Sequence, residues 1–200
     1  MKKLLNIGLI AAFLAFGGFL FGVAEQGKLL QENVIRLHVV ANSDSEADQA
    51  VKLQVRDAIT AYLSPILADF KSQEEAREYL QAHLRELQEI ANEVLAQLGS
   101  RDTAVITLAL EEFPRRVYDT FSLPSGVYES LRVRIGDAQG QNWWCVVFPQ
   151  LCLPATAEDF DATAVAAGFP ESLADALQGE NEIRFFFLDC LGQLENFFFE

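Results

Sequence analysis

The chain opens with a long apolar segment. Two lysines precede a run from Leu4 to Val23 that contains no charged residue. Twenty residues of α-helix span about 30 Å, which is the hydrocarbon thickness of a bilayer. Gly22 and Ala24 are small residues placed as in a signal-peptidase site, so a cleaved signal peptide and a retained signal anchor both stay open for residues 1–24. In either case the lysines stay in the cytoplasm and the rest of the chain is expected to be exported.

A β-strand is predicted after a short polar segment. Residues 25–33 are polar, and we interpret them as a short linker. From Val34 to Ala41 apolar side chains alternate with Arg36 and His38, and this period of two is typical of a strand. Residues 34–200 are therefore expected to form one globular domain that begins with this strand.

Two amphipathic helices are predicted to follow. Ser43 and Glu46 have the spacing of a capping box, which predicts the start of a helix that Pro65 ends or interrupts. The same spacing recurs at Ser72. Apolar residues then repeat at intervals of three and four as far as Gly99, which predicts one long second helix.

Strands dominate the next part of the pattern. The period changes to two from Thr103. Arg116–Leu123 and Val127–Ile135 flank a turn at Pro124–Gly126, and we predict that they pair as a β-hairpin. Asn142–Phe148 is apolar on both faces, which predicts a central strand of the sheet.

The last part of the chain completes the predicted fold. A short helix is expected to begin near Pro170, and Ile183–Leu188 is expected to be a final strand. The fold class is therefore α+β. We expect a mixed, mostly antiparallel sheet covered by two long helices and preceded by one N-terminal hydrophobic helix.

Composition excludes several functions. The 200 residues include 15 Lys and Arg against 29 Asp and Glu, which gives a formal net charge of −14. Nucleic-acid binding requires clustered cations, so no nucleic-acid partner is expected. The sequence contains no G-x-S-x-G, H-E-x-x-H, P-loop or dinucleotide-binding motif, and no cofactor is expected. Its three cysteines lack the spacing of a four-ligand zinc site, and no metal site is expected.

A small polar cluster is expected at the end of the first strand. Arg36 and His38 share one face and point toward the loop that contains Asn42 and Asp44. Two interpretations stay open. In the first, His38, Asp44 and Asp48 are acid–base groups of a cell-envelope hydrolase. In the second, His38 is a hydrogen-bonded structural side chain, and Asn42 and Asp44 cap the next helix.

A group of arginines is expected on the predicted hairpin. In the register set by its turn, Arg116 lies opposite Arg134 and Tyr118 lies opposite Arg132. Facing like charges are destabilising, so carboxylates are needed nearby. The protein's own acids or the acidic groups of a partner can supply them, and both interpretations stay open. One of the two tryptophans that follow is expected to be an exposed contact residue. The candidate partner-binding residues are Arg116, Tyr118, Arg132, Arg134, Trp143 and Trp144.

Cys145 and Cys152 are expected to form a structural disulfide. Six residues separate them, Pro149 can bend the chain, and an exported domain meets an oxidising environment. A redox-active pair is the alternative, but such pairs usually have the closer C-x-x-C spacing. Cys190 is left over in this scheme and is expected to be buried among Phe185, Phe186 and Phe187.

Several segments together resemble one known family. Ile35–Ser45, Arg116–Tyr118, Leu123–Tyr128 and Asn142–Pro149 are similar, in order and spacing, to the stage II sporulation protein R family. The resemblance covers most of residues 34–152, with the Ile183-Arg-Phe segment in addition.

This resemblance implies a signalling role. Such proteins are made in the forespore of a spore-forming bacterium and exported into the space between the forespore and mother-cell membranes. There they activate a membrane-embedded aspartic protease of the mother cell, which processes pro-sigma-E. The resemblance implies no enzymatic activity and supplies no catalytic residues. We therefore expect an exported activator that acts by protein–protein contact, and the hydrolase with His38 remains the alternative.

Overall fold

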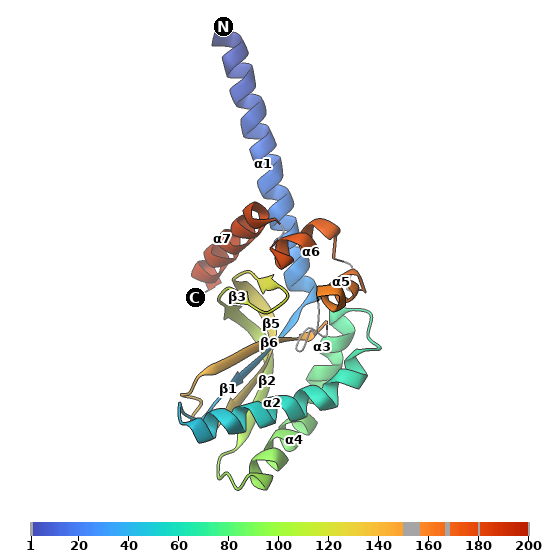
Figure 1. The fold of residues 1–200 in the computed structure, drawn as a ribbon, viewed down its shortest axis with the longest axis vertical. Coiled ribbons are helices and arrows are strands. Elements are labelled where there is room, and N and C mark those ends of the chain that lie inside the picture. The colour runs from blue at the N-terminus through green and yellow to red at the C-terminus, as the bar shows by residue number, and fades with distance from the viewer. Residues whose placement is uncertain (1, 150–156, 167–168, 180, 200) are drawn as a thin grey trace.

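The computed structural model describes residues 2–149, 157–166, 169–179 and 181–199, and it confirms an α+β fold (Figure 1). Its main sheet has the strand order β2-β5-β1-β6, and β3 and β4 form a separate two-stranded sheet. The helices are α1 (Lys2–Asn33), α2 (Glu46–Leu67), α3 (Gln73–Ala82), α4 (Leu84–Gln97), α5 (Ala157–Ala166), α6 (Glu171–Gln178) and α7 (Glu182–Phe199). The strands are β1 (Ile35–Val40), β2 (Ala104–Phe113), β3 (Arg116–Val117), β4 (Ser122–Leu123), β5 (Gly126–Ile135) and β6 (Asn142–Phe148).

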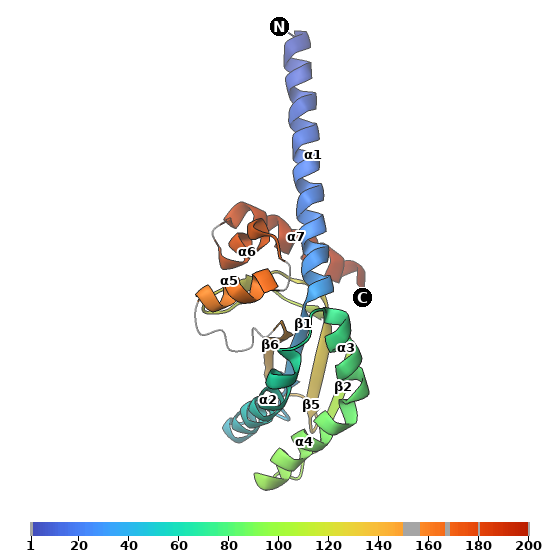
Figure 2. The ribbon, with the colours of Figure 1, turned by 90° about the vertical axis from the view of Figure 1, so that its right-hand side faces the viewer.

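Helix α1 continues without a break from the apolar segment into the domain, and its first half projects away from the rest of the molecule (Figures 1 and 2). Residues 25–33, predicted as a linker, form its last turns. They are helical because one side of them is apolar and the domain buries it: Val23 and Leu30 are inaccessible to solvent. Within the residues that the structure describes, α1 alone is long and apolar enough to cross a membrane.

The main sheet is mixed and mostly antiparallel, as predicted. Strand β1 pairs in parallel with β5, whereas β6 is antiparallel to β1 and β2 is antiparallel to β5. Helices α2 and α4 cover one face of this sheet. The apolar core lies between them and the inward side chains of the strands, among them Leu37, Val39, Leu131 and Val133.

The predicted start and end of the first domain helix differ from the structure in two ways. Helix α2 begins two residues later than the capping-box spacing indicated, because Ser45 rather than Ser43 accepts the hydrogen bond from the backbone N–H of Asp48. Pro65 lies inside α2 instead of ending it. It stands in the last turn, where the missing proline N–H costs a single intrahelical hydrogen bond.

The predicted second helix is two helices, α3 and α4, that meet at His83. Ser72 caps α3 as expected, and its side chain accepts the N–H of Glu75. The imidazole of His83 then bonds the Tyr79 carbonyl oxygen at 2.8 Å and stacks on the Tyr79 ring with centroids 3.9 Å apart. The break lies at His83, whose backbone N–H still bonds the carbonyl oxygens of Tyr79 and Leu80.

The predicted hairpin of Arg116–Leu123 with Val127–Ile135 is wrong. Half of the first segment is irregular, and its two short strands β3 and β4 pair with each other. Strand β5 pairs instead with β2 and β1, because both offer long alternating strands that bury the apolar face of β5. Arg132 is therefore aligned with Thr107 and His38, and the predicted register with Tyr118 does not exist.

Two further predictions are corrected. Asn142–Phe148 is an edge strand, not a central one. It is apolar on both sides because Val147 packs in the core beneath α2 and α4, whereas Val146 packs with the carboxyl-terminal helices on the other face. The predicted final strand Ile183–Leu188 belongs to α7. A short apolar run fits either structure, and here the helical repeat extends over 18 residues.

Helix α7 docks on the turn between β4 and β5 through one buried polar contact. Asp189 accepts hydrogen bonds from the backbone N–H and the hydroxyl group of Ser125, both at 2.8 Å. Both residues are buried. At Gly192, one turn further along, the helix backbone approaches so closely that a Cβ atom would overlap the Ser125 carbonyl oxygen. A side chain is therefore excluded at position 192 while α7 is docked.

We expect Gly192→Ala to lower the free energy of unfolding by roughly 1 to 3 kcal/mol, because the overlap with Ser125 outweighs alanine's helix propensity. Gly27→Ala is the matched control, since a Cβ there would meet Leu188 at an ordinary 3.6 Å. Denaturant unfolding of both variants checks this, and equal stability would show that α7 does not dock as described.

Candidate functional site

The sheet face opposite α2 and α4 is covered at one end only. Near the end of α1 it is overlaid by α6, α7 and the β3–β4 sheet (Figure 1). Farther along, Val105 is 49% exposed, and Thr107 and Ala109 are exposed as well. We call the uncovered part the open sheet face. Its residues are Val105, Thr107, Ala109, Glu111, Arg132, Arg134, His38, Asn142 and Trp144.

A carboxylate lies at the centre of this face. One oxygen of Glu111 pairs with Arg132 Nη1 at 2.9 Å, and the other lies 3.4 Å from His38 Nδ1. The second ring nitrogen of His38, Nε2, lies 2.8 Å from Asn142 Oδ1. The β1–β5 register, which places His38 beside Arg132, brings these groups together. The four side chains come from four different strands, so the sheet itself fixes their positions.

Aromatic rings and a second arginine extend the cluster toward the covered end. The Trp144 ring stacks with His38 at a centroid distance of 5.6 Å. The Arg116 guanidinium carbon lies 3.5 Å from the centre of the same indole ring. Tyr118 donates a hydrogen bond to the Trp144 carbonyl oxygen at 3.3 Å. Trp144 thus joins the short β3–β4 sheet to the open sheet face.

Arg36 lies beneath the covered end, fully buried and without a carboxylate partner among the residues described. Its Nη2 donates to the Tyr118 hydroxyl at 3.0 Å, and its Nε donates to the Cys145 carbonyl oxygen at 3.3 Å. The guanidinium carbon lies 4.3 Å from the Phe113 ring centre and 5.1 Å from that of Tyr128. Cation–π contacts and neutral acceptors therefore stabilise this charge.

The environment keeps the central carboxylate ionised. Burial alone would raise the pKa of Glu111, but His38, Ser130 and Arg132 together lower it below its ordinary value. Burial raises the pKa of Tyr118, and the neighbouring charge of Arg36 opposes that shift. At neutral pH the face therefore presents a paired carboxylate and a neutral phenol among arginine side chains.

The structure brings most of the predicted partner-binding residues together. Arg116, Tyr118, Arg132 and Trp144 join Arg36 and His38 of the predicted polar cluster in one continuous set of contacts. Arg134 lies at the far, exposed end of the same face. Trp143 points to the opposite face, where Arg56 of α2 lies 4.2 Å from its ring centre.

Asn42 and Asp44 do not join His38. Asn42 donates to Asp48 at 3.1 Å and accepts the backbone N–H of Asp137 at 2.9 Å, so it links the start of α2 to the turn after β5. Asp44 is exposed in this corner. Hydrogen bonds from Ser43 and Asn42 lower the pKa of Asp48, which holds it as a carboxylate at the helix start. Asn42 and Asp48 are therefore structural, and the hydrolase hypothesis loses Asp48 as an acid–base group.

Glu111 is the functional-site residue that the sequence did not reveal. Its strand was recognised, but its position depends on the pairing of β2 with β5, which the predicted hairpin displaced. The sequence did contain one indication of such a residue, because arginines that face each other need a carboxylate beside them.

The structure tests only part of the prediction for the cysteines. Cys145 is disulfide-bonded and buried, and Cys190 is free and exposed, not buried as predicted. Cys152, its predicted partner, lies outside the described residues, so that pairing stays a prediction. Among the described residues no group of three or more His, Cys, Asp or Glu side chains is placed to hold a metal ion.

Comparison with known proteins identifies the family. The family model described as stage II sporulation protein R matches residues 31–158. The chain belongs to the stage II sporulation protein R family. It is also 35% identical, over 161 residues, to the stage II sporulation protein R of Bacillus subtilis strain 168, a match that covers 76% of this chain and 71% of the relative. No solved structure matches the chain.

This membership supports a role in sporulation. The matched residues include every strand of the main sheet and therefore the whole open sheet face. They begin at the end of α1 and leave out α6 and α7.

Replacing the central carboxylate tests the geometry of this face. At pH 7 we expect Glu111→Gln to lower the free energy of unfolding by roughly 1 to 3 kcal/mol, because glutamine does not neutralise Arg132. Since the folded protein lowers the pKa of Glu111, its contribution is complete above the ordinary carboxyl pKa and is lost as the pH falls through the lowered value. The stability difference between wild type and variant should therefore narrow in acid, as measured by denaturant unfolding at several pH values.

The control is Glu112→Gln, which removes the neighbouring exposed carboxylate on the opposite side of β2. It should leave stability almost unchanged. A pH-independent difference between wild type and Glu111→Gln would contradict the ionised, paired state of Glu111.

Proposed function

We propose that this family member is an exported sporulation signal that activates the membrane-embedded aspartic protease processing pro-sigma-E in the mother cell. It acts by contact through the open sheet face and catalyses no reaction itself. The single observation that carries this proposal is the character of that face. It is open, cationic and aromatic on a protein whose net charge is −14.

Charge complementarity indicates the chemistry of the partner. Only one carboxylate, Glu111, is paired with the arginine and histidine at the centre of the face. Arg134 at the exposed end forms no ion pair within the described part of the chain. An acidic extracytoplasmic segment of the protease would complete this set and be steered toward it.

The position of the face suits a partner held in a membrane. Strand β1 starts two residues after α1 ends, and Arg134 is aligned with Val40 at the other end of β1. At about 3.3 Å per residue, the whole face lies within roughly 20 Å of the end of α1. In the proposed arrangement α1 stands in the forespore membrane, and the open end of the face points away from that membrane, toward the mother-cell membrane that holds the protease.

Activation by contact requires that the face bind one state of the protease better than the other, because a ligand shifts an equilibrium only by its differential affinity. A rigid surface suits this task. The side chains of the open sheet face stand on four paired strands, and Trp144 is packed between His38 and Arg116. Little conformational entropy is then lost when the partner binds.

Charge reversal at the exposed end tests the contact. We expect Arg134→Glu to reduce pro-sigma-E processing in sporulating cells roughly tenfold or more, because a like charge now faces an acidic partner. The measurement is the ratio of processed to unprocessed sigma factor at matched levels of the variant protein. Arg85→Glu, on the exposed surface of α4, is the control and should leave processing unchanged.

If Arg134→Glu and the combined replacement of Arg116, Arg132 and Arg134 by Gln both process pro-sigma-E normally, the open sheet face is not the contact surface. Loss of processing in the Arg85→Glu control would point to the opposite side of the domain.

A second variant separates contact from catalysis. His38→Gln keeps a hydrogen-bonding side chain beside Asn142 but removes the imidazole. A binding surface should keep processing within a few fold, whereas loss of an imidazole acid–base group costs on the order of 100-fold or more. A defect of that size in protein with unchanged thermal unfolding would support the hydrolase alternative instead.

A further inference from the structure

Helix α7 carries an apolar stripe that the domain does not cover. Ile183 is 69% exposed, Phe186 is 60% exposed and Phe197 is 74% exposed. With Cys190 and Leu194 between them, these residues follow one another at intervals of three and four, which places them on one side of the helix. The opposite side, with Phe185, Leu188, Asp189 and Gly192, is the one that docks on the domain.

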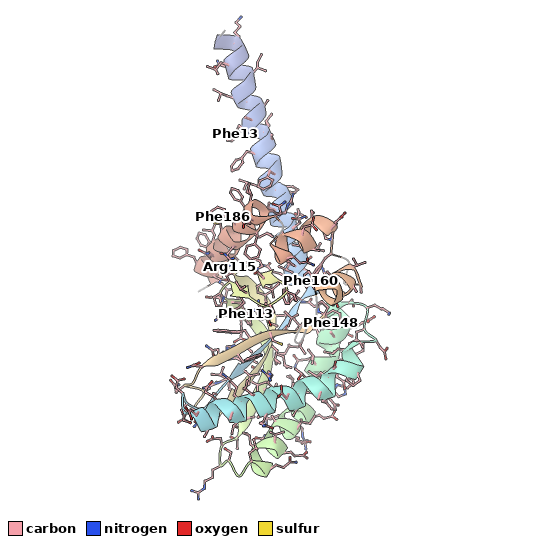
Figure 3. The ribbon with its side chains drawn as sticks, viewed as in Figure 1. Phe13, Phe113, Arg115, Phe148, Phe160 and Phe186 are labelled. Atoms are coloured by element: carbon pink, nitrogen blue, oxygen red, sulfur yellow. The ribbon has the colours of Figure 1, made fainter. Side chains whose placement is uncertain are left out.

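The first half of α7 lies against the apolar part of α1. The Phe187 ring contacts Phe19 and Phe16, with centroid distances of 5.5 and 5.9 Å. Arg184 lies over the Phe19 ring at 5.6 Å and donates to Gln26 Oε1 at 2.7 Å. Figure 3 shows Phe186 on this part of α7, beside α1.

These contacts fix the depth of α7. If α1 spans a bilayer with the uncharged run that ends at Val23, a rise of 1.5 Å per residue puts Phe19 and Phe16 about 6 and 10 Å inside the hydrocarbon boundary. Phe187 must lie at that level. Helices that rest in a membrane interface bury their apolar side about 5 to 10 Å deep, so the first half of α7 has the depth of such a helix.

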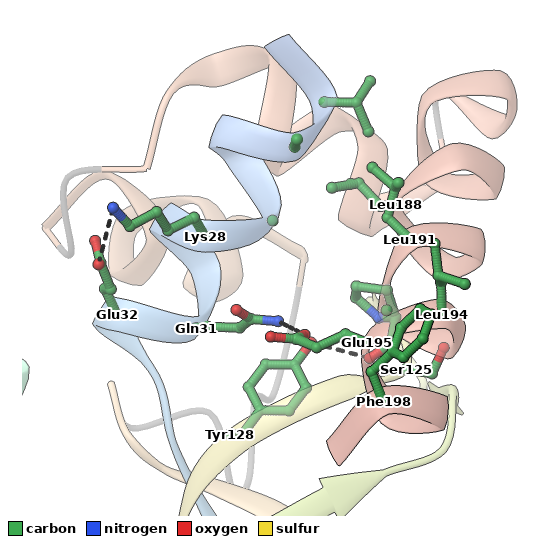
Figure 4. A pocket seen from close by; sticks show the side chains of 15 residues that line it. Lys28, Gln31, Glu32, Ser125, Tyr128, Leu188, Leu191, Leu194, Glu195 and Phe198 are labelled. Atoms are coloured by element: carbon green, nitrogen blue, oxygen red, sulfur yellow. Dashed lines mark hydrogen bonds and ion pairs between the residues drawn. The ribbon is translucent and has the colours of Figure 1, made fainter. Parts of the chain in front are cut away.

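Polar side chains mark the water side of the same junction. Below the contact of Phe187 with α1, a groove of about 620 Å³ separates α1 from α7 (Figure 4). Its polar lining includes the Lys28–Glu32 ion pair and the hydrogen bond from Gln31 to Glu195. The ring contacts of α7 thus fall on residues 16 and 19 of α1, and its side-chain hydrogen bonds fall on residues 26 and 31, nearer the domain.

The packing of α7 on α1 requires that α1 is retained. Val23 is fully buried, and the chain is helical through residues 22–24, where a signal-peptidase site was considered. Cleavage there would remove Phe16 and Phe19 and leave the Phe187 ring without its partners.

We propose that the amino-terminal half of α7 inserts its apolar stripe into the interface of the bilayer that α1 spans. The occupant of the stripe is phospholipid with a zwitterionic headgroup. Helix α7 carries three acids, Glu182, Asp189 and Glu195, against the single cation Arg184, so anionic headgroups are repelled. The domain is then held at the bilayer surface by two elements, α1 and α7, instead of swinging on one helix.

The free thiol of Cys190 supplies the probe. It is exposed on the stripe, and Cys145 is disulfide-bonded, so a thiol-reactive nitrobenzoxadiazole label applied without reductant reports on α7. Peptide mass analysis confirms the labelled site. The full chain is reconstituted into phosphatidylcholine nanodiscs that contain doxyl-labelled lipid. We expect strong quenching, greater from a doxyl group near the headgroup than from one near the acyl terminus.

The double variant Ile183→Glu/Phe186→Glu should reduce that quenching roughly twofold or more, because the charged side chains leave the interface. Leu98→Glu is the matched control, since it replaces an exposed apolar side chain on the far end of the domain and should not change the quenching. Circular dichroism establishes that both variants fold.

Four results would overturn the proposal. The first is a label that doxyl lipid does not quench because it lies in water. The second is quenching that the double variant leaves unchanged. The third is a label that responds to the number of chains per disc and not to doxyl lipid, which would show that a second copy covers the stripe. Intact mass of the protein from cell membranes must also include residues 1–24, and their loss would remove the proposed arrangement.

Discussion

The docking of α7 is the interaction on which the rest of the structure depends. The buried Ser125–Asp189 hydrogen bonds and the close approach at Gly192 hold this helix on the β4–β5 turn. Phe187 and Arg184 of the same helix contact α1 and so join the apolar amino-terminal helix to the domain. Docked in this way, α7 covers one end of the sheet and leaves the other end open. The extent of the open sheet face follows from that docking.

The open sheet face exists because α7 and its neighbours cover only one end of the sheet. Under the covered end, Arg36 is buried among Phe113, Tyr128 and Tyr118, where neutral acceptors and aromatic rings replace a carboxylate. In the uncovered part, Glu111 is shared between Arg132 and His38 and leaves the face with an excess of cations. An acidic protein that collects arginines in one place does so at a cost in repulsion. The proposed contact with an acidic partner would account for that cost.

The sequence pattern correctly predicted those elements that depend on residues close together in the chain. The alternation in β1, the cap at Ser72 and the mixed sheet are confirmed, because burial on one side imposes a period that a sequence displays. The hairpin and the last strand were wrong for a different reason. Strand partners are chosen by long-range burial, and the apolar run at Ile183–Leu188 fits a helix or a strand equally until its neighbours are known. Six of the candidate residues still meet, since β1 lies beside β5 in the folded sheet, but Glu111 could not be found without that pairing.

Site-specific photocrosslinking in sporulating cells tests the central claim most directly. A photoreactive amino acid at Thr107 stands on the open sheet face, and one at Glu93 stands on the exposed side of α4. The account predicts a crosslink from position 107 to the pro-sigma-E protease and none from position 93. Crosslinks from position 93 alone, or no crosslink to the protease from position 107 while pro-sigma-E is being processed, would contradict it.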